Sequence, residues 1–520
     1  MSVFRFGEDT LTPSVALQIV KGNCKGIFSN RTRQKIAAAR AAVESMVAAG
    51  QVVYGINTGF GSLCTTVISP EQTALLQFNL LRSHSVGVGA PLANDLAKLM
   101  LILKAHSLAM GFSGVSMDVM ERILLHIETD AIPVVPTQGS VGASGDLAPL
   151  AHLFLPLIGL GYVSWQGKIL PAESWLQQMG LSPLELHAKE GLALINGTQF
   201  IAAHAVKVVE RLHNCLENAD IIGAMTLEGV LGSVSPFDEQ LHAIRPFVGA
   251  QHVAYRLRTL LKDSPMVASH ANCGRVQDPY SIRCMPQVHG ASRNAWLHLK
   301  DLVTTEINSV TDNPIILDHQ RAVSGGNFHG QLLALPLDYA AIAAAELGNI
   351  SDRRIYLLLE GPAGLPVLLM RNTGINSGFM IPQYTSAALV SENKSLCFPA
   401  SVDSIPTSLG QEDHVSMGSI SGRKALQVIE NLENILAIEL LCAAQAFDFR
   451  RPLRSTALLE ACHELVRSHI DHAESDRLFY NDILQAQQIV REQWLPKTVA
   501  QAAARYHITL ESPWQALFNF

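Results

Sequence analysis

The sequence predicts a mainly α-helical fold built on a bundle of long helices. Three long runs have helical apolar periodicity: Ala291–Ile307, Gln331–Glu360 and Arg423–Phe447. In the last run, apolar residues recur at intervals of three and four, which places them on one face of a helix. Strand signals are few, and the repeated strand–helix alternation of a doubly wound sheet is missing from the sequence. Long helices with an apolar face bury that face against one another, so we expect a bundle.

Shorter elements surround these long helices. We expect helices over Arg31–Ala49, which is rich in alanine, over Leu96–Met110, and after Ser116, whose hydroxyl can cap the helix start. Residues 162–170 and 314–323 combine short strand-like runs with turn residues, the second near Asp318. These two segments predict small hairpins on a helical body.

Composition narrows the class of protein. The 520 residues are 48% hydrophobic and only 16% charged, against about a quarter in a typical globular protein. Part of the surface is therefore expected to lie against other subunits. The net charge of −7, without a run of lysine and arginine, makes nucleic acid an unsuitable partner.

The cysteines and the apolar segments bear on location. Eight cysteines are scattered without CxxC spacing, which is typical of unpaired thiols in a reducing compartment, so we expect a cytoplasmic protein. No signal peptide is read at the start. The uncharged run 147–166 is interrupted by proline and glycine, and we expect a buried core segment there and no membrane span.

The most informative motif is GSVGASGDLAPLAH, residues 139–152. Its glycines remove the usual steric limits on backbone angles, so the Gly145 nitrogen can attack the Ala143 carbonyl carbon. Loss of two waters, one taking the Ser144 hydroxyl, would leave a methylidene-imidazolone (MIO) ring with an electrophilic double bond. Ala-Ser-Gly alone is more often a flexible turn. A serine hydrolase is disfavoured, because the run around Ser144 does not fit the G-x-S-x-G elbow.

The motif has companions along the chain. They are VYGINTGFG (53–61), LRSHSVG (81–87), ALINGTQ (193–199), VQDPYSIRCMPQVHG (276–290), TDNP (311–314), SGGNFHG (324–330) and SIPTSLGQEDHVSMG (404–418). Together they resemble the MIO-dependent ammonia-lyases of aromatic amino acids, and most closely their histidine ammonia-lyase branch. The resemblance implies a fumarase/aspartase-like helical bundle over residues 113–520. It also implies a smaller N-terminal domain over residues 1–112, with a mobile loop and the substrate-selecting segment.

The resemblance assigns roles to residues near the electrophile. Tyr54 is expected to be the base that removes the β-proton, and His84 to hydrogen-bond the substrate ring. Asn196 is expected to donate its amide to the ring oxygen of the electrophile. Taken singly, these residues are a buried tyrosine, a structural histidine and an Asn-Gly turn.

Further positions follow from the resemblance. Arg283 is expected to hold the substrate carboxylate with its planar guanidinium, and Gln277 and Tyr280 to lie at the electrophile. Phe328 is expected to shield the electrophile from water. Two neighbouring positions depart from the family pattern: Met285 stands where glutamine is usual, and His289 where a hydrophobic residue is usual.

Glu412 is the strongest indication of the substrate. Phenylalanine and tyrosine lyases have a neutral, glutamine-containing sequence here, whereas a carboxylate suits an imidazole and can help with the β-proton. The resemblance therefore implies deamination of L-histidine to trans-urocanate and ammonia. Either the amine or the ring of the substrate could attack the electrophile, and the amine is preferred because it is the group that leaves. A tyrosine or phenylalanine ammonia-lyase, or an MIO aminomutase, is the alternative. A non-catalytic helical oligomer is a more remote one.

Cofactors and assembly follow from the same resemblance. The expected cofactor is the MIO group made from Ala143, Ser144 and Gly145, with no external cofactor. The expected partners are an amino acid substrate and identical subunits, in a homotetramer whose sites take residues from three subunits. No metal site is expected, because His329 lacks an HExxH pattern. His463, His469 and His472 are interpreted as a solvated helix face.

Overall fold

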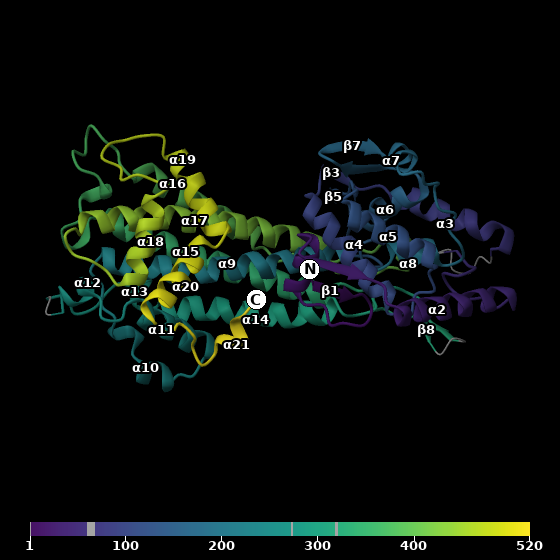
Figure 1. Ribbon diagram of the computed structural model, residues 1–520, viewed down its shortest axis with the longest axis horizontal. Coiled ribbons are helices and arrows are strands. Elements are labelled where there is room, and N and C mark those ends of the chain that lie inside the picture. The colour runs from purple at the N-terminus through teal and green to yellow at the C-terminus, as the bar shows by residue number, and fades with distance from the viewer. Residues whose placement is uncertain (1, 60–67, 272–273, 318–320) are drawn as a thin grey trace. The chain divides into compact units, whose positions relative to one another are not determined.

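The fold is mainly α-helical, as the sequence predicts. The computed structural model describes residues 2–59, 68–271, 274–317 and 321–520 (Figure 1). Its longest helices are α9 (Gln199–Gly229), α14 (Met285–Glu306), α15 (Gln331–Leu359) and α17 (Gly418–Phe449). In α17 the apolar repeat becomes core, since Val428, Leu432 and Leu436 are fully buried. Burial of this face is what stabilises such long helices.

The chain forms two compact units, each assembled from separate stretches of sequence. Unit 1 comprises residues 1–207, 299–338 and 399–423, and unit 2 comprises residues 208–298, 339–398 and 424–520. Four of the five boundaries fall within the four long helices, and the fifth lies between residues 398 and 399. This division differs from the predicted domains 1–112 and 113–520, whose boundary lies inside unit 1. Those two domains stay a prediction.

Unit 1 contains the strands and the shorter helices of the first half of the chain. Its helices are α1 (Pro13–Val20), α2 (Asn30–Ala48), α3 (Pro70–His84), α4 (Asn94–Ala109), α5 (Met117–Thr129), α6 (Leu147–Phe154), α7 (Ala172–Gln178) and α8 (Glu190–Ile195). Its strands are β1 (Ser2–Arg5), β2 (Cys24–Ile27), β3 (Val88–Pro91), β4 (Ile132–Pro133), β5 (Pro136–Gln138), β6 (Tyr162–Trp165), β7 (Lys168–Pro171), β8 (Ile315–Leu317) and β9 (Arg321–Val323). The predicted helices correspond to α2, α4 and α5, and the hydroxyl of Ser116 accepts the Val119 N–H at the start of α5.

Helix α4 forms the centre of unit 1. It packs against α1, α2, α5 and β4, and its residues from Leu96 to Ala109 are all buried. A helix that is apolar on all sides belongs inside a protein. The lysine at position 104 of this helix is therefore a buried charge, and it bears on the site described below.

The strands form small sheets at the edges of unit 1. Strands β6 and β7 form the first predicted hairpin, with Trp165 opposite Lys168, and β8 and β9 form the second. The turn expected near Asp318 lies outside the described residues. Strands β1 and β2 pair in parallel, which the sequence did not indicate.

The segment 147–166 forms α6, a short 3-10 turn and β6, as expected for a core segment. Leu150, Phe154 and Leu157 within it are fully buried. None of the described helices combines the length and hydropathy needed to cross a bilayer.

Unit 2 is helical in its described part. Besides the long helices it contains α10 (Glu239–Ala243), α11 (Val248–Leu260), α12 (Pro265–Ala268), α13 (Tyr280–Arg283), α16 (Met380–Leu396), α18 (Ala457–Arg467), α19 (Phe479–Arg491), α20 (Trp494–Tyr506) and α21 (Gln515–Phe518). Helices α18 and α20 pack closely against each other (Figure 1).

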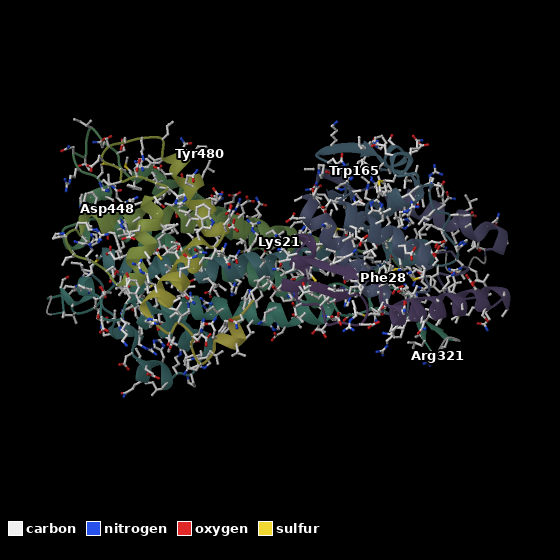
Figure 2. The ribbon with its side chains drawn as sticks, in the orientation of Figure 1. Lys21, Phe28, Trp165, Arg321, Asp448 and Tyr480 are labelled. Atoms are coloured by element: carbon white, nitrogen blue, oxygen red, sulfur yellow. The ribbon has the colours of Figure 1, made fainter. Side chains whose placement is uncertain are left out.

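The interpretation of His463 and His472 as part of a solvated helix face is wrong. Both rings bond to the carboxylate of Asp448, which is labelled in Figure 2, with nitrogen–oxygen distances of 2.8 Å. Arg467 donates to the same carboxylate at 2.9 Å. Asp448 lies on α17, His463 and Arg467 lie on α18, and His472 lies in the segment after α18. They converge in a non-local arrangement that spacing alone does not reveal. Only His469 is exposed, as expected.

Candidate active site

The Ala-Ser-Gly motif forms a strained turn between β5 and α6. Ser144 has φ of 50° and Gly145 has φ of 83°, both in the left-handed region. For serine this conformation costs about 1–3 kcal/mol and persists only when the surrounding structure imposes it. At position 145 only glycine fits, because a Cβ there would lie 2.1 Å from the carbonyl oxygen of Gly197.

The surrounding structure that imposes this turn is the segment after α8. The Gly197 N–H donates to the Ser144 carbonyl oxygen at 3.3 Å, and the Asp146 N–H donates to the Gly197 carbonyl oxygen at 2.8 Å. The two segments thus pair as a short parallel bridge. Helix α8 ends at Ile195, so Asn196 leaves the helix directly beside Ser144.

A cavity of about 430 Å³ opens beside Ser144, within the size range typical of small-molecule sites. Its lining contains several predicted residues, all from unit 1: Tyr54, His84, Ser144, Asn196 and Glu412. Tyr54 is half-buried, in the turn after α2, and Gly59 of the same loop also lines the cavity. Phe60 and Gly61, the rest of the predicted mobile loop, lie outside the described residues.

Glu412 contacts the motif directly. The Ser144 hydroxyl donates to Glu412 Oε1 at 3.1 Å, and the Thr407 hydroxyl donates to Glu412 Oε2 at 3.0 Å. The backbones of Thr407 and Glu412 also pair with each other. These contacts hold the carboxylate at the cavity wall. A solvated surface glutamate would lack such contacts.

His84 ends α3 and faces the same cavity. Burial lowers the pKa of its imidazole, although a backbone hydrogen bond and the nearby Glu412 carboxylate raise it in part. Its Nδ1 lies 3.0 Å from the Ser83 hydroxyl. A neutral imidazole has one nitrogen that donates and one that accepts, so the ring can pair with a polar substrate ring.

Asn196 has an unused polar atom. Its side chain is only 3% exposed, and its Oδ1 has no hydrogen-bond partner in the described part of the chain. An unpaired buried amide oxygen is unfavourable, so this acceptor in a cavity wall is suited to accept a hydrogen bond from a bound group.

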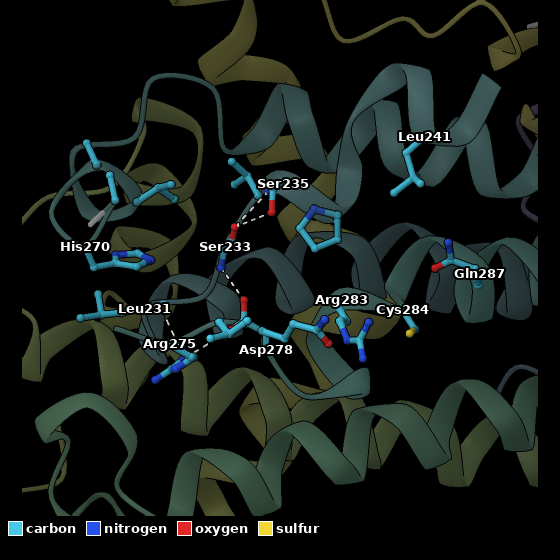
Figure 3. A pocket seen from close by; sticks show the side chains of 17 residues that line it. Leu231, Ser233, Ser235, Leu241, His270, Arg275, Asp278, Arg283, Cys284 and Gln287 are labelled. Carbon is cyan, nitrogen blue, oxygen red and sulfur yellow. Dashed lines mark hydrogen bonds and ion pairs between the residues drawn. The ribbon is translucent and has the colours of Figure 1, made fainter. Parts of the chain in front are cut away.

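Three further predicted residues lie in unit 2: Gln277, Tyr280 and Arg283, of which Figure 3 labels Arg283. Arg283 and Gln277 line a different cavity, of about 630 Å³, and the Arg283 guanidinium carbon lies 4.5 Å from the centre of the exposed Tyr280 ring. The Arg283 Nε is buried, with no partner among the residues described. A guanidinium with a free donor can bind a carboxylate.

The remaining positions lie away from both cavity linings. Phe328 is half-buried in the turn before α15 and is not among the lining residues of the cavity beside Ser144. Met285 and His289 are fully buried in unit 2, where His289 Nδ1 lies 2.8 Å from Asp220 Oδ1. Their departure from the family pattern therefore concerns the packing of unit 2, since neither lines one of the two cavities.

Comparison with known proteins decides the family. Residues 11–468 match the family model described as aromatic amino acid lyase. This chain belongs to that family. It is 50% identical to a histidine ammonia-lyase of Sorangium cellulosum, over 90% of this chain and 94% of that protein.

Solved structures agree with the family assignment. A histidine ammonia-lyase from Trypanosoma cruzi is 43% identical, with a TM-score of 0.90 over 100% of this chain and 97% of the other. A tyrosine aminomutase from Streptomyces globisporus is 34% identical, with a TM-score of 0.90 over 96% and 99%. The chain is thus an amino acid ammonia-lyase with the helical fold of these enzymes.

Sequence reasoning about this lyase missed the charged groups beneath the turn. Lys104 Nζ donates to the Asn196 carbonyl oxygen at 2.6 Å, and Asp146 Oδ2 accepts the Ile201 N–H at 3.0 Å. Burial lowers the pKa of Lys104 to about 7 and raises the pKa of Asp146 to about 7. The available signal was a pair of lysines, Lys98 and Lys104, within the apolar run of α4.

A buried ion pair lies close to Lys104. Lys189 Nζ pairs with Asp312 Oδ2 at 2.8 Å, and the Ser113 hydroxyl donates to Asp312 Oδ1 at 2.9 Å. Among the residues described, clusters of histidine, cysteine and carboxylate side chains with metal-ligand geometry are not found.

Proposed function

We propose that this chain is a histidine ammonia-lyase that converts L-histidine to trans-urocanate and ammonia. The observation that carries the proposal is the Glu412 carboxylate, 3.1 Å from the Ser144 hydroxyl in a cavity that His84 also lines. A carboxylate and a neutral imidazole can pair with the two nitrogens of a substrate imidazole. The relatives named above as histidine ammonia-lyases support the same substrate.

We infer that Ala143, Ser144 and Gly145 form an MIO group. Two features fit it: the left-handed turn at Ser144 and the absence of space for a side chain at Gly145. Once formed, this group supplies an electrophilic carbon that makes the substrate amine a better leaving group. No external cofactor is proposed.

The side chains of the chain itself then bind and orient the substrate. His84 and Glu412 hold the imidazole, and Tyr54, which lines the same cavity, takes the β-proton. Arg283 holds the carboxylate through its unpaired donor. Gln277, Tyr280 and Phe328 are proposed to complete the wall around the reacting atoms and to exclude water.

We propose that the enzyme is a homotetramer whose sites combine residues from three subunits. Apolar side chains exposed on unit 2 favour self-association: Ile244 is 82% exposed and Phe247 is 55% exposed, and both line a cavity of about 640 Å³. Large exposed apolar groups around a cavity are typical of interaction sites. The low charged fraction of the chain favours the same assembly.

A complementation experiment tests the shared site. Ser144→Ala and Arg283→Ala are each expected to abolish turnover. When the two variants are coexpressed, some sites in mixed tetramers contain a native Ser144 from one subunit and a native Arg283 from another, so part of the activity should return. Fully inactive mixed tetramers, or active protein at monomer mass in sizing chromatography, would contradict shared sites.

The substrate is tested by incubating the purified enzyme with histidine, tyrosine and phenylalanine and following the ultraviolet absorbance of each unsaturated product. Urocanate is expected to form fastest. Glu412→Gln should reduce kcat/KM for histidine by about 10²-fold, the scale of a lost charged contact to substrate, and leave residual tyrosine turnover largely unchanged. Faster formation of coumarate from tyrosine would overturn the substrate assignment.

We also propose a cytoplasmic location. The six cysteines in the described part of the chain are free thiols, four of them buried, as in proteins of reducing compartments. Alkylation of the denatured protein without reductant should modify all eight cysteines of the sequence. Protected pairs would indicate disulfides and an oxidising location.

A further inference from the structure

Lys104 occupies an unusual position for a lysine. It is fully buried in α4, and its Nζ donates to the Asn196 carbonyl oxygen at 2.6 Å and lies 3.5 Å from Gln199 Oε1. Burying an ammonium group is costly unless strong hydrogen bonds or nearby charges compensate. The contact with the Asn196 carbonyl is short, as expected for a bond from a charged donor.

The peptide group that Lys104 holds continues to the electrophile turn. The Asn196 carbonyl and the Gly197 N–H belong to one peptide group, and that N–H donates to the Ser144 carbonyl oxygen at 3.3 Å. The Ser144 carbonyl and the Gly145 nitrogen in turn belong to one peptide group. A hydrogen-bonded chain thus runs from the Lys104 ammonium to the nitrogen that must attack Ala143.

The surroundings of Lys104 have opposing effects on its pKa. Burial is the largest influence and lowers its pKa to about 7. The carboxylates of Asp312 and Asp146 favour the ammonium, and Lys189 opposes it. Lys189 is itself paired with Asp312 at 2.8 Å. The ammonium therefore depends largely on the Asn196 carbonyl for its close contact.

Ring closure places a demand on the Gly145 amide. As its nitrogen bonds to the Ala143 carbonyl carbon, the Gly145 amide proton passes to the former carbonyl oxygen, which becomes a hydroxyl. That hydroxyl leaves as water with the Ser144 amide proton, and the Ser144 hydroxyl leaves as a second water with the Ser144 α-proton. Neither an oxidant nor a reductant is needed. The Gly145 nitrogen is a strong nucleophile only as its proton leaves, and a more acidic N–H gives up that proton more readily.

We propose that Lys104 is a positioning residue for formation of the electrophile. Its ammonium polarises the Asn196–Gly197 peptide group, which draws electron density through the Ser144 carbonyl and makes the Gly145 N–H more acidic. Hydrogen-bonded groups in a low-dielectric interior polarise one another in this way. The same contact fixes the Asn196–Gly197 segment against the turn. This inference rests on the proposed function, because it concerns the formation of the MIO group.

The test compares Lys104→Met with Lys98→Met in the full-length protein. Methionine keeps much of the volume of lysine and removes the charge and the donor. Lys98 is the matched control, because it is a buried lysine of the same helix, six residues earlier, and it pairs with Asp130 at 2.5 Å. Each protein is made by cell-free synthesis, and its intact mass is followed with time for the loss of two waters.

Lys104→Met is expected to cyclise at least about tenfold more slowly than the wild type, the factor expected when a hydrogen bond from a charged group is lost. Lys98→Met should cyclise at the wild-type rate. Equal rates for Lys104→Met and the wild type would overturn the role of Lys104. A wild-type protein at its full encoded mass would instead overturn the MIO proposal itself, so the two failures are distinguishable.

A purely structural role for Lys104 is distinguished from a role in ring formation by measuring the mass only of folded protein that elutes at the wild-type volume in sizing chromatography. Where Lys104→Met does not fold, Lys104→Arg and Lys104→Gln give the comparison, because arginine keeps a charged donor and glutamine keeps only a neutral one. Faster ring formation in Lys104→Arg than in Lys104→Gln is expected. The reverse order at equal thermal stability would contradict the proposal.

Discussion

Buried charges occur in both units of this lyase, but they are arranged differently. In unit 2, Asp220 accepts from Arg293 at 2.5 Å, from Arg256 at 2.8 Å and bonds His289 at 2.8 Å. Burial alone would raise the pKa of Asp220, but these cationic and hydrogen-bonding neighbours lower it overall. In unit 1, Asp146 is equally buried and faces backbone N–H groups and the Ser140 hydroxyl, and its pKa is raised to about 7.

The difference teaches how burial can serve two purposes. Around Asp220 each charge meets an opposite charge, so the groups stay ionised and hold the helices together. Around Ser144, desolvation is only partly compensated, and the pKa values of Asp146 and Lys104 both move to about 7. Titratable groups whose pKa values are shifted by burial toward neutral pH are typical of functional sites. The region around Ser144 should therefore be sensitive in catalysis, and the region around Asp220 in stability.

Two serine substitutions should distinguish the two regions, and one of them has the largest expected effect on turnover. Ser144 and Ser351 each donate a hydroxyl to a glutamate, Glu412 at 3.1 Å and Glu439 at 2.6 Å. Ser144→Ala removes the hydroxyl that leaves during MIO formation. Its kcat should fall by more than about 10⁴-fold, because remaining acid–base help supplies at most about that factor. Steady-state kinetics and intact mass measure the effect.

Ser351→Ala is the control for this prediction. It should lower the free energy of unfolding by about 1–3 kcal/mol, since Glu439 loses a buried partner, and leave kcat within a few-fold of the wild type. A loss of turnover comparable to that of Ser144→Ala would show that the two regions are not distinct in function.

Asp220→Asn tests the region around Asp220. The substitution keeps the shape of the side chain but leaves Arg256 and Arg293 with one carboxylate fewer. Breaking a buried ion pair by removing one partner costs about 3–5 kcal/mol, so the thermal midpoint should fall clearly in differential scanning calorimetry. Protein that retains its midpoint would mean that Glu217, which bonds both arginines at 2.9 Å, is sufficient.

The sequence predicts those parts of the structure that depend on neighbours along the chain. The apolar repeat of α17 and the Ser116 cap of α5 are local, and both are confirmed. The motif around Ser144 also predicts its own conformation, because Gly145 adopts the left-handed angle that its glycine allows. Tyr54, His84 and Glu412 were grouped through resemblance alone, and the structure shows that they line one cavity with Ser144.

What the sequence could not predict depends on contacts between distant segments. Three contacts show this. Strands β1 and β2 pair in parallel although neither has a strand signal in the sequence. The bond from Lys104 to Asn196 and the contact of His289 with Asp220 join residues far apart in sequence. A charged residue within an apolar helix does not reveal its partner. Roles for Arg283, Gln277, Tyr280 and Phe328 stay predictions for the same reason.

Asp146→Asn should have a smaller effect on stability than Asp220→Asn, and of the opposite sign. The folded-state pKa of Asp146 is about 7 and lies above the ordinary value of 3.8. The stability that this carboxyl contributes is therefore fully present below pH 3.8 and is lost as the pH rises through 7. At pH 8 the folded protein holds a buried carboxylate, whereas an asparagine there is neutral at every pH.

The asparagine amide can also satisfy the neighbours of Asp146. Its oxygen can accept the Ile201 N–H, and its NH₂ can donate to the Ser140 hydroxyl. We expect the variant to be more stable than the wild type by on the order of 2 kcal/mol at pH 8, with the advantage vanishing near pH 4. Thermal midpoints across this pH range measure the difference. A loss of stability at pH 8 as large as that of Asp220→Asn would mean that Asp146 is compensated as fully as Asp220, and the contrast between the two regions would fail.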